Sequence, residues 1–148
     1  MRVIIQKVKE SSVTVNNTLL GETQHGLMLL VGFTHTDTFE DIQYCAKKVV
    51  QMRIFEDENE KMNLSLKDVG GSILSISQFT LYAQTKKGNH PSFTEAAKPD
   101  LAIALYEQFN EELRSYDVEV ATGEFGAMMD VALINEGPVT IILDSKNR

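Results

Sequence analysis

The stretch Ser72-Ile73-Leu74-Ser75-Ile76-Ser77-Gln78-Phe79-Thr80-Leu81-Tyr82 follows a chain-breaking pair, Gly70-Gly71. Side chains alternate between the two faces of a β-strand. One face would therefore carry Ile73, Ser75, Ser77, Phe79 and Leu81, and the other Leu74, Ile76, Gln78, Thr80 and Tyr82. Because both faces mix apolar and polar side chains, we expect a strand over Ser72–Tyr82 that touches both the core and a functional site.

Apolar patterns on both sides of this stretch predict further strands. Met1–Val15 alternates imperfectly, which indicates one long strand or two short ones, and Asn16-Asn17 is a turn signal. Leu27–Val31 is unbroken and too short for a helix, so it predicts a buried central strand. Closing strands are expected at Val118–Thr122, Met128–Ile134 and Val139–Leu143.

Two segments have the spacing of amphipathic helices. The first begins after Thr38, a capping residue with an acid three positions on, and its apolar residues are Ile42, Cys45, Ala46, Val49, Val50 and Ile54. Pro99 suits the first turn of the second helix, whose buried stripe is expected at Leu101, Leu105, Phe109 and Leu113. The charged segment Glu56–Lys61 and the basic segment Ala83–His90 are expected to be loops.

Strands and helices that do not strictly alternate predict an α+β fold. We expect mixed or antiparallel β-sheets that curl into a barrel-like core, with two amphipathic helices. The 148 residues suffice for one ordinary domain. Since neither a repeat nor a linker divides the chain, residues 1–148 are expected to form that single domain.

The composition is that of an acidic globular protein. Its 43% hydrophobic and 24% charged residues are close to globular averages, which excludes disordered and collagen-like chains. No apolar run approaches the roughly 18 residues that a membrane span needs. With a single cysteine and no secretory signal, a cytoplasmic protein without a membrane partner is expected. The net charge of −7 argues against DNA binding through a global basic field but leaves a local basic patch open.

The usual catalytic constellations are missing from the sequence. The three histidines, His25, His35 and His90, form no His-x-x-x-His pair, and Cys45 lies on an apolar helix stripe. We therefore expect neither a metal site nor a cofactor. No Gly-x-Ser-x-Gly elbow and no phosphate-cradling glycine loop is present. Periodicity alone predicts only an α+β domain of unknown role.

Two motifs point to a function: Ser77-Gln78-Phe79-Thr80-Leu81 and Asn135-Glu136-Gly137-Pro138-Val139-Thr140. Together with Arg53-Ile54-Phe55, Lys61-Met62-Asn63, Pro91-Ser92-Phe93 and Phe125-Gly126-Ala127, they closely resemble the D-aminoacyl-tRNA deacylase family. The resemblance runs from Ile5-Gln6 to Ser145, in the order found in that family.

The resemblance implies a hydrolase acting on the ester that joins a D-amino acid, or wrongly charged glycine, to the terminal ribose of tRNA. It implies chiral proofreading in translation, by a metal-free homodimer with its active site at the subunit interface. Gly137-Pro138 would be cis and would reach into the partner's pocket as a chirality gate. The Ser77–Thr80 segment would form the catalytic wall.

The chemistry of these residues is consistent with such a gate. Because Gly137 lacks a Cβ, a ligand can approach its backbone closely, and carbonyl oxygens suit the ammonium group of an amino acid. A rigid main chain that holds the ammonium, the ester and the Cα–H leaves only one direction for a side chain. An L-residue would then be excluded sterically, whereas many D-residues and glycine would be accepted.

Thr80 could be considered as a nucleophile, but its motif contains no base to activate it. We favour backbone N–H groups near Phe79 and Thr80 as donors to the oxyanion that develops on the ester. The ribose 2′-hydroxyl would assist the attack or orient a water molecule. Ser77 and Gln78 would set the geometry.

Further candidates concern the tRNA itself. By resemblance, Phe125 and Met129 line a pocket for the terminal adenosine, although both also suit a core. Lys86 and Lys87, followed by Lys7 and Lys9, are the candidates for contacts with tRNA phosphates. At Lys7, His90 and Glu136 the chain departs from the family's common arginine, arginine and aspartate. An alternative function is a non-catalytic RNA- or protein-binding module on the same fold.

Overall fold

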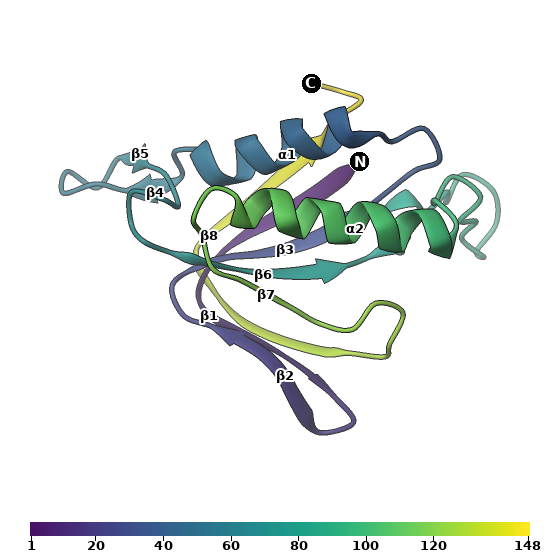
Figure 1. Ribbon diagram of the computed structural model, residues 1–148, viewed down its shortest axis with the longest axis horizontal. Helices are drawn as coiled ribbons and strands as arrows, with labels where there is room; N and C mark the ends of the chain where they lie inside the picture. The colour runs from purple at the N-terminus through teal and green to yellow at the C-terminus, as the bar shows by residue number, and fades with distance from the viewer.

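The long first strand organises the sheet in the computed structural model, which describes residues 1–148. One edge of β1 (Arg2–Val15) pairs with β8 (Asp130–Asp144), and the other edge is shared by β3 (Gly26–Gly32) and β2 (Thr18–Thr23). Beyond β3 follow β6 (Ser72–Ser77) and β7 (Val120–Thr122), both parallel to it. The sheet curls until β2 approaches β7, so it nearly closes into a barrel (Figure 1).

Two helices, α1 (Phe39–Gln51) and α2 (Pro99–Arg114), lie side by side on one face of this sheet (Figure 1). The main core lies between them and the sheet, and its largest buried side chains include Ile5, Leu29, Ile42 and Phe109. A second cluster fills the inside of the curl, formed by Val8, Val13, Met28, Leu74 and Ile76. Neither helix has the length and apolar character that crossing a membrane requires.

Local sequence signals explain how both helices begin. At the start of α1 the Thr38 N–H donates to the Asp41 carboxylate, 2.8 Å away, as the spacing of cap and acid predicts. Pro99 occupies the first turn of α2, where its missing N–H costs nothing. The α+β class, the turn at Asn16-Asn17 and the central position of β3 are all confirmed.

The predicted strand over Ser72–Tyr82 is wrong in its second half. β6 ends at Ser77, and a short 3₁₀ helix, η1 (Phe79–Tyr82), follows. The Gln78 N–H still donates to Val31 O, 2.7 Å away, but β3 ends one residue later at Gly32. With no neighbouring strand left to pair with, the chain closes a tight turn through Leu81 N–H to Gln78 O.

Other boundaries also differ from the predictions. Met128–Ile134 and Val139–Leu143 belong largely to one strand, β8, while Met128 itself is exposed. The segment after α1 contains a small hairpin of β4 (Phe55–Glu56) and β5 (Met62–Leu64), and Ile54 lies outside the helix. A stripe spaced by four residues drifts around a helix of 3.6 residues per turn. Leu101 is therefore 37% exposed, and Ala102 and Tyr106 are buried instead.

Candidate active site

The first motif lies where β6 ends and η1 begins. Ser77 is the last residue of β6, and the Gln78 side-chain amide donates a hydrogen bond to the Thr80 hydroxyl, 2.5 Å away. Phe79 and Thr80 are both exposed. They are the first two residues of η1, and the first N–H groups of a helix have no acceptor within it. This turn therefore presents two backbone donors and one side-chain hydroxyl to solvent.

Contacts from α2 and from β1 hold the two ends of this turn. The Tyr106 hydroxyl donates to Ser75 O at 2.6 Å, so α2 fixes the end of β6 from below. Arg2 Nη1 donates to Leu81 O at 2.9 Å, and its guanidinium lies 4.4 Å from the centre of the Tyr82 ring. Burial raises the pKa of both tyrosine hydroxyls, and the neutral Tyr106 hydroxyl is the donor to Ser75 O.

Beside the motif lies an apolar cavity of about 430 Å³. Phe79, Phe93 and Phe125 line it, and Phe79 meets Phe93 edge to face with ring centroids 5.1 Å apart. The segment that carries Phe93 is held by a hydrogen bond between His35 Nε2 and Thr94 O, 2.7 Å long. Such a cavity suits a planar base. Sequence reasoning missed Phe93 as a site residue, although Pro91-Ser92-Phe93 is among the motifs that carry the resemblance.

The structure does not bring Met129 to this cavity. Met129 packs against the second cluster inside the curl, beside Gly123, and it is not among the residues that line the cavity. Phe125 and Met129 therefore lie in different environments. The reason is the turn between β7 and β8, which directs Phe125 toward the Tyr106 ring on α2, 6.2 Å away.

The prediction for Lys7 also differs from the structure. Its side chain is only 4% exposed, and Nζ lies 3.7 Å from Glu136 Oε1 and 5.8 Å from the centre of the Phe55 ring. A buried and paired ammonium group is unavailable to a tRNA phosphate. Lys86 and Lys87 are exposed in the loop after η1 and form no ion pair.

The second motif lies in β8, where the Gly137–Pro138 peptide bond is cis and both residues are exposed. In the sheet, Ser77 is level with Val3, whereas Gly137-Pro138 lies between the partners of Gln6 and Val8. With about 3.3 Å per strand residue and about 4.8 Å per strand spacing, Ser77 and Gly137 are roughly 20 Å apart in one protomer. A single chain therefore does not bring the two motifs together.

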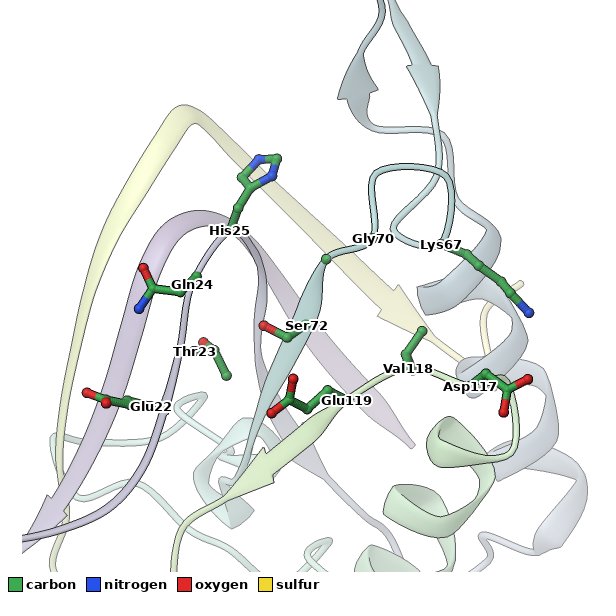
Figure 2. A pocket seen from close by; sticks show the side chains of 11 residues that line it. Glu22, Thr23, Gln24, His25, Lys67, Gly70, Ser72, Asp117, Val118 and Glu119 are labelled. Atoms are coloured by element: carbon green, nitrogen blue, oxygen red, sulfur yellow. The ribbon is translucent and has the colours of Figure 1, made fainter.

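A polar cavity of about 570 Å³ lies at the other end of the parallel strands, where β3, β6 and β7 begin. Figure 2 shows His25, Ser72 and Glu119 around it, with Lys67 at its rim. No three histidine, cysteine, aspartate or glutamate side chains of the protein converge as metal ligands. Burial raises the pKa of the Cys45 thiol to about 12, so this cysteine is not a reactive thiolate.

The chain is similar to proteins of one named family. The family model described as D-Tyr-tRNA(Tyr) deacylase matches residues 4–144. A protein of Bacillus licheniformis named D-aminoacyl-tRNA deacylase is 62% identical over 99% of both chains. One of the same name from Exiguobacterium sibiricum is 60% identical over 97% of this chain and 99% of its own.

Two solved structures share the fold. A c-Myc DNA unwinding element binding protein is 36% identical, with a TM-score of 0.91 over 97% of this chain and 98% of its own. A probable eukaryotic D-amino acid tRNA deacylase has a TM-score of 0.81 over 96% of this chain and 97% of its own. Its sequence identity is 21%, so this second likeness concerns the fold alone.

Proposed function

The chain belongs to the D-Tyr-tRNA(Tyr) deacylase family, and from this premise we infer the function of its site. It is a D-aminoacyl-tRNA deacylase, a hydrolase that cleaves the ester between a D-amino acid and the terminal ribose of tRNA. The observation that carries this conclusion is about 60% identity over the whole chain with relatives of that name. A non-catalytic binding module is not favoured, because both motifs are intact.

The geometry of the motif supports hydrolysis by positioning. Water adds to the ester carbonyl carbon, the bond from that carbon to the ribose oxygen breaks, and the ribose oxygen takes up a proton. The N–H groups of Phe79 and Thr80 would bind the oxyanion that forms in between. The Thr80 hydroxyl accepts a hydrogen bond from Gln78, and no basic side chain contacts it. Thr80 therefore acts in positioning, and the ribose 2′-hydroxyl orients the water.

The active site would be completed by a second copy of the chain. Since the two motifs are roughly 20 Å apart in one protomer, Gly137-Pro138 would enter the partner's pocket rather than its own. The face of the sheet away from the helices supports this arrangement. Cross-strand neighbours Ile142, Ile4 and Leu30 form an apolar row there, level with Ile76 and one residue from the level of Ser77, and Ile142 is 73% exposed.

In this homodimer, backbone atoms of Gly137-Pro138 would exclude L-side chains and admit D-residues and glycine. The cavity beside Phe79 and Phe125 would take the terminal adenosine, and Lys86 and Lys87 would meet phosphates of the acceptor end. An enzyme that proofreads aminoacyl-tRNA in this way would act in the cytoplasm.

A deacylation assay on matched D-Tyr-tRNA, L-Tyr-tRNA and glycyl-tRNA tests the activity and its specificity. We expect rapid release of D-tyrosine and of glycine, with L-Tyr-tRNA hydrolysed close to the uncatalysed rate. Binding of tRNA without turnover of any ester would contradict the enzyme and favour the binding module.

Subunit complementation tests the shared site. Gln78→Ala damages the catalytic wall and Gly137→Ala damages the gate, so each homodimer should be inactive. A mixed dimer places the intact wall of one subunit against the intact gate of the other in one of its two sites. Mixing the two variants under exchange should therefore recover activity, whereas a site built within one protomer would recover none.

A further inference from the structure

The Gly137-Pro138 segment is tied to its own protomer through one carboxylate. Glu136 Oε1 lies 3.7 Å from Lys7 Nζ and 3.2 Å from His25 Nε2. Lys7 comes from β1 and His25 from the turn between β2 and β3, so two separate elements hold the residue directly before Gly137. Figure 2 shows His25 at the rim of the polar cavity, beside the bend of β8.

The segment Glu136–Val139 lacks backbone pairing with the neighbouring strand. The ladder between β1 and β8 pairs Val8 with Asn135 and Gln6 with Thr140, and its register shifts between them. No residue from Glu136 to Val139 has a ladder partner. Proline has no N–H to donate, so Pro138 cannot add a backbone bond of its own. Side-chain contacts must therefore replace the missing backbone bonds.

The surroundings strengthen these contacts. The Lys7 side chain is 4% exposed, and Glu136 provides the only carboxylate within 4.0 Å of its ammonium group. Phe55, which is 2% exposed, lies against both Lys7 and His25. Water has little access to the Lys7 ammonium group, so its attraction for Glu136, whose side chain is 32% exposed, is screened less than that of a pair of surface side chains.

We propose that Glu136, clamped by Lys7 and His25, is a positioning residue that fixes Gly137-Pro138 and so sets the preference for D- over L-aminoacyl-tRNA. This inference rests on the proposed function. Steric exclusion separates D- from L-substrates only if the excluding backbone does not move. The two substrates differ only in the direction of the bond from Cα to the side chain. Loosening the clamp should therefore impair discrimination more than it impairs hydrolysis.

The test compares kcat/KM for D-Tyr-tRNA and L-Tyr-tRNA across four proteins. Glu136→Gln keeps the shape of the side chain and removes its charge, and we expect its D/L ratio to fall about tenfold or more, as for a lost charge-assisted contact. Glu136→Asp keeps the charge and should recover part of the ratio. Asp130→Asn, an exposed carboxylate without an ion pair on the same strand, should leave the ratio unchanged.

The outcomes separate the clamp from the activity. If the unmodified enzyme does not hydrolyse D-Tyr-tRNA, the proposed function fails. If it is D-selective and folded Glu136→Gln keeps its D/L ratio, the clamp is overturned, and an equal loss on both substrates overturns it too. Should Glu136→Gln not fold, His25→Ala takes its place in the comparison, because the His25 side chain is 44% exposed and its loss leaves the contact between Lys7 and Glu136 intact. An unchanged D/L ratio in His25→Ala would then overturn the clamp.

Discussion

At the scale of single residues, the hydrogen bond of the Thr80 hydroxyl indicates the role of this residue. Its hydroxyl accepts the Gln78 amide at 2.5 Å, and no histidine, lysine or carboxylate contacts it. A threonine hydroxyl without a base is a poor nucleophile. This supports the proposal that the chemistry of this site depends on the main chain of η1 rather than on a reactive side chain.

Thr80→Ala should accordingly retain substantial deacylation. We expect a loss of about tenfold or less in kcat, because one neutral hydrogen bond of about 1 kcal/mol is removed. Single-turnover assays on D-Tyr-tRNA measure this, with circular dichroism as the control for folding. A fall to background together with an acyl-threonine trapped in the unmodified enzyme would contradict it.

Gly137 is constrained by its backbone conformation. Its φ is +126°, and a Cβ would lie 2.9 Å from Val139 Cγ2 and 3.0 Å from Val139 N. Gly137→Ala should therefore lose about 1–3 kcal/mol of unfolding free energy and most of its activity on D-Tyr-tRNA. Gly70→Ala is the matched control, because its φ is also positive, at +64°, but its Cβ would meet nothing within 4 Å. Equal behaviour of the two variants would refute the steric argument.

At the scale of elements, the start of α1 contains an unusual carboxylate. Asp41 is 4% exposed. Burial alone would raise its pKa, but hydrogen bonds from the Ser145 side chain, the Thr38 backbone and Lys146 outweigh it and lower the pKa from 3.8 to about 2. The charged form is thus favoured in the folded protein, and α1 is joined to the C-terminal segment.

This shift makes stability depend on pH. A lowered folded-state pKa contributes stability above the unfolded pKa, and that contribution is lost as the pH falls from about 4 to about 2. Asp41→Asn should reduce the unfolding free energy by roughly 2 kcal/mol at pH 7. The difference from the unmodified protein should shrink below pH 4 in urea titrations. A difference that stays constant with pH would show that the charge is not responsible.

At the scale of the whole molecule, we propose that a second subunit docks on the face of the sheet away from the helices. The row of Ile142, Ile4 and Leu30 lies one residue from the level of Ser77, so a partner that covers this row would also lie near the first motif. A charge at Ile142 would be buried without a partner in such an interface.

Ile142→Glu should therefore shift the protein from dimer to monomer and abolish deacylation, while the protomer stays folded because this side chain is 73% exposed. Sedimentation velocity measures the shift over a range of concentrations. Leu19→Glu, on the distant hairpin and 51% exposed, is the control and should remain dimeric. A monomeric Ile142→Glu variant with full D-selective activity would overturn the shared site.

Local features of the helices, and the family to which the chain belongs, are determined by the sequence alone. The apolar stripe of α1, its cap at Thr38 and the start of α2 at Pro99 follow from helical spacing and from the chemistry of single residues. The family, and with it the activity, followed from short segments such as Ser77–Thr80 because their order and spacing are specific.

The tertiary structure decided what depends on partners distant in the chain. β6 ends at Ser77 because β3 ends, and no pattern within Ser72–Tyr82 records that. Lys7 on β1 is buried and paired with Glu136 on β8, which lies near the other end of the chain. Ion pairs and strand pairing form only between residues that are in contact. They are therefore determined by the fold of the sheet, which brings distant residues together.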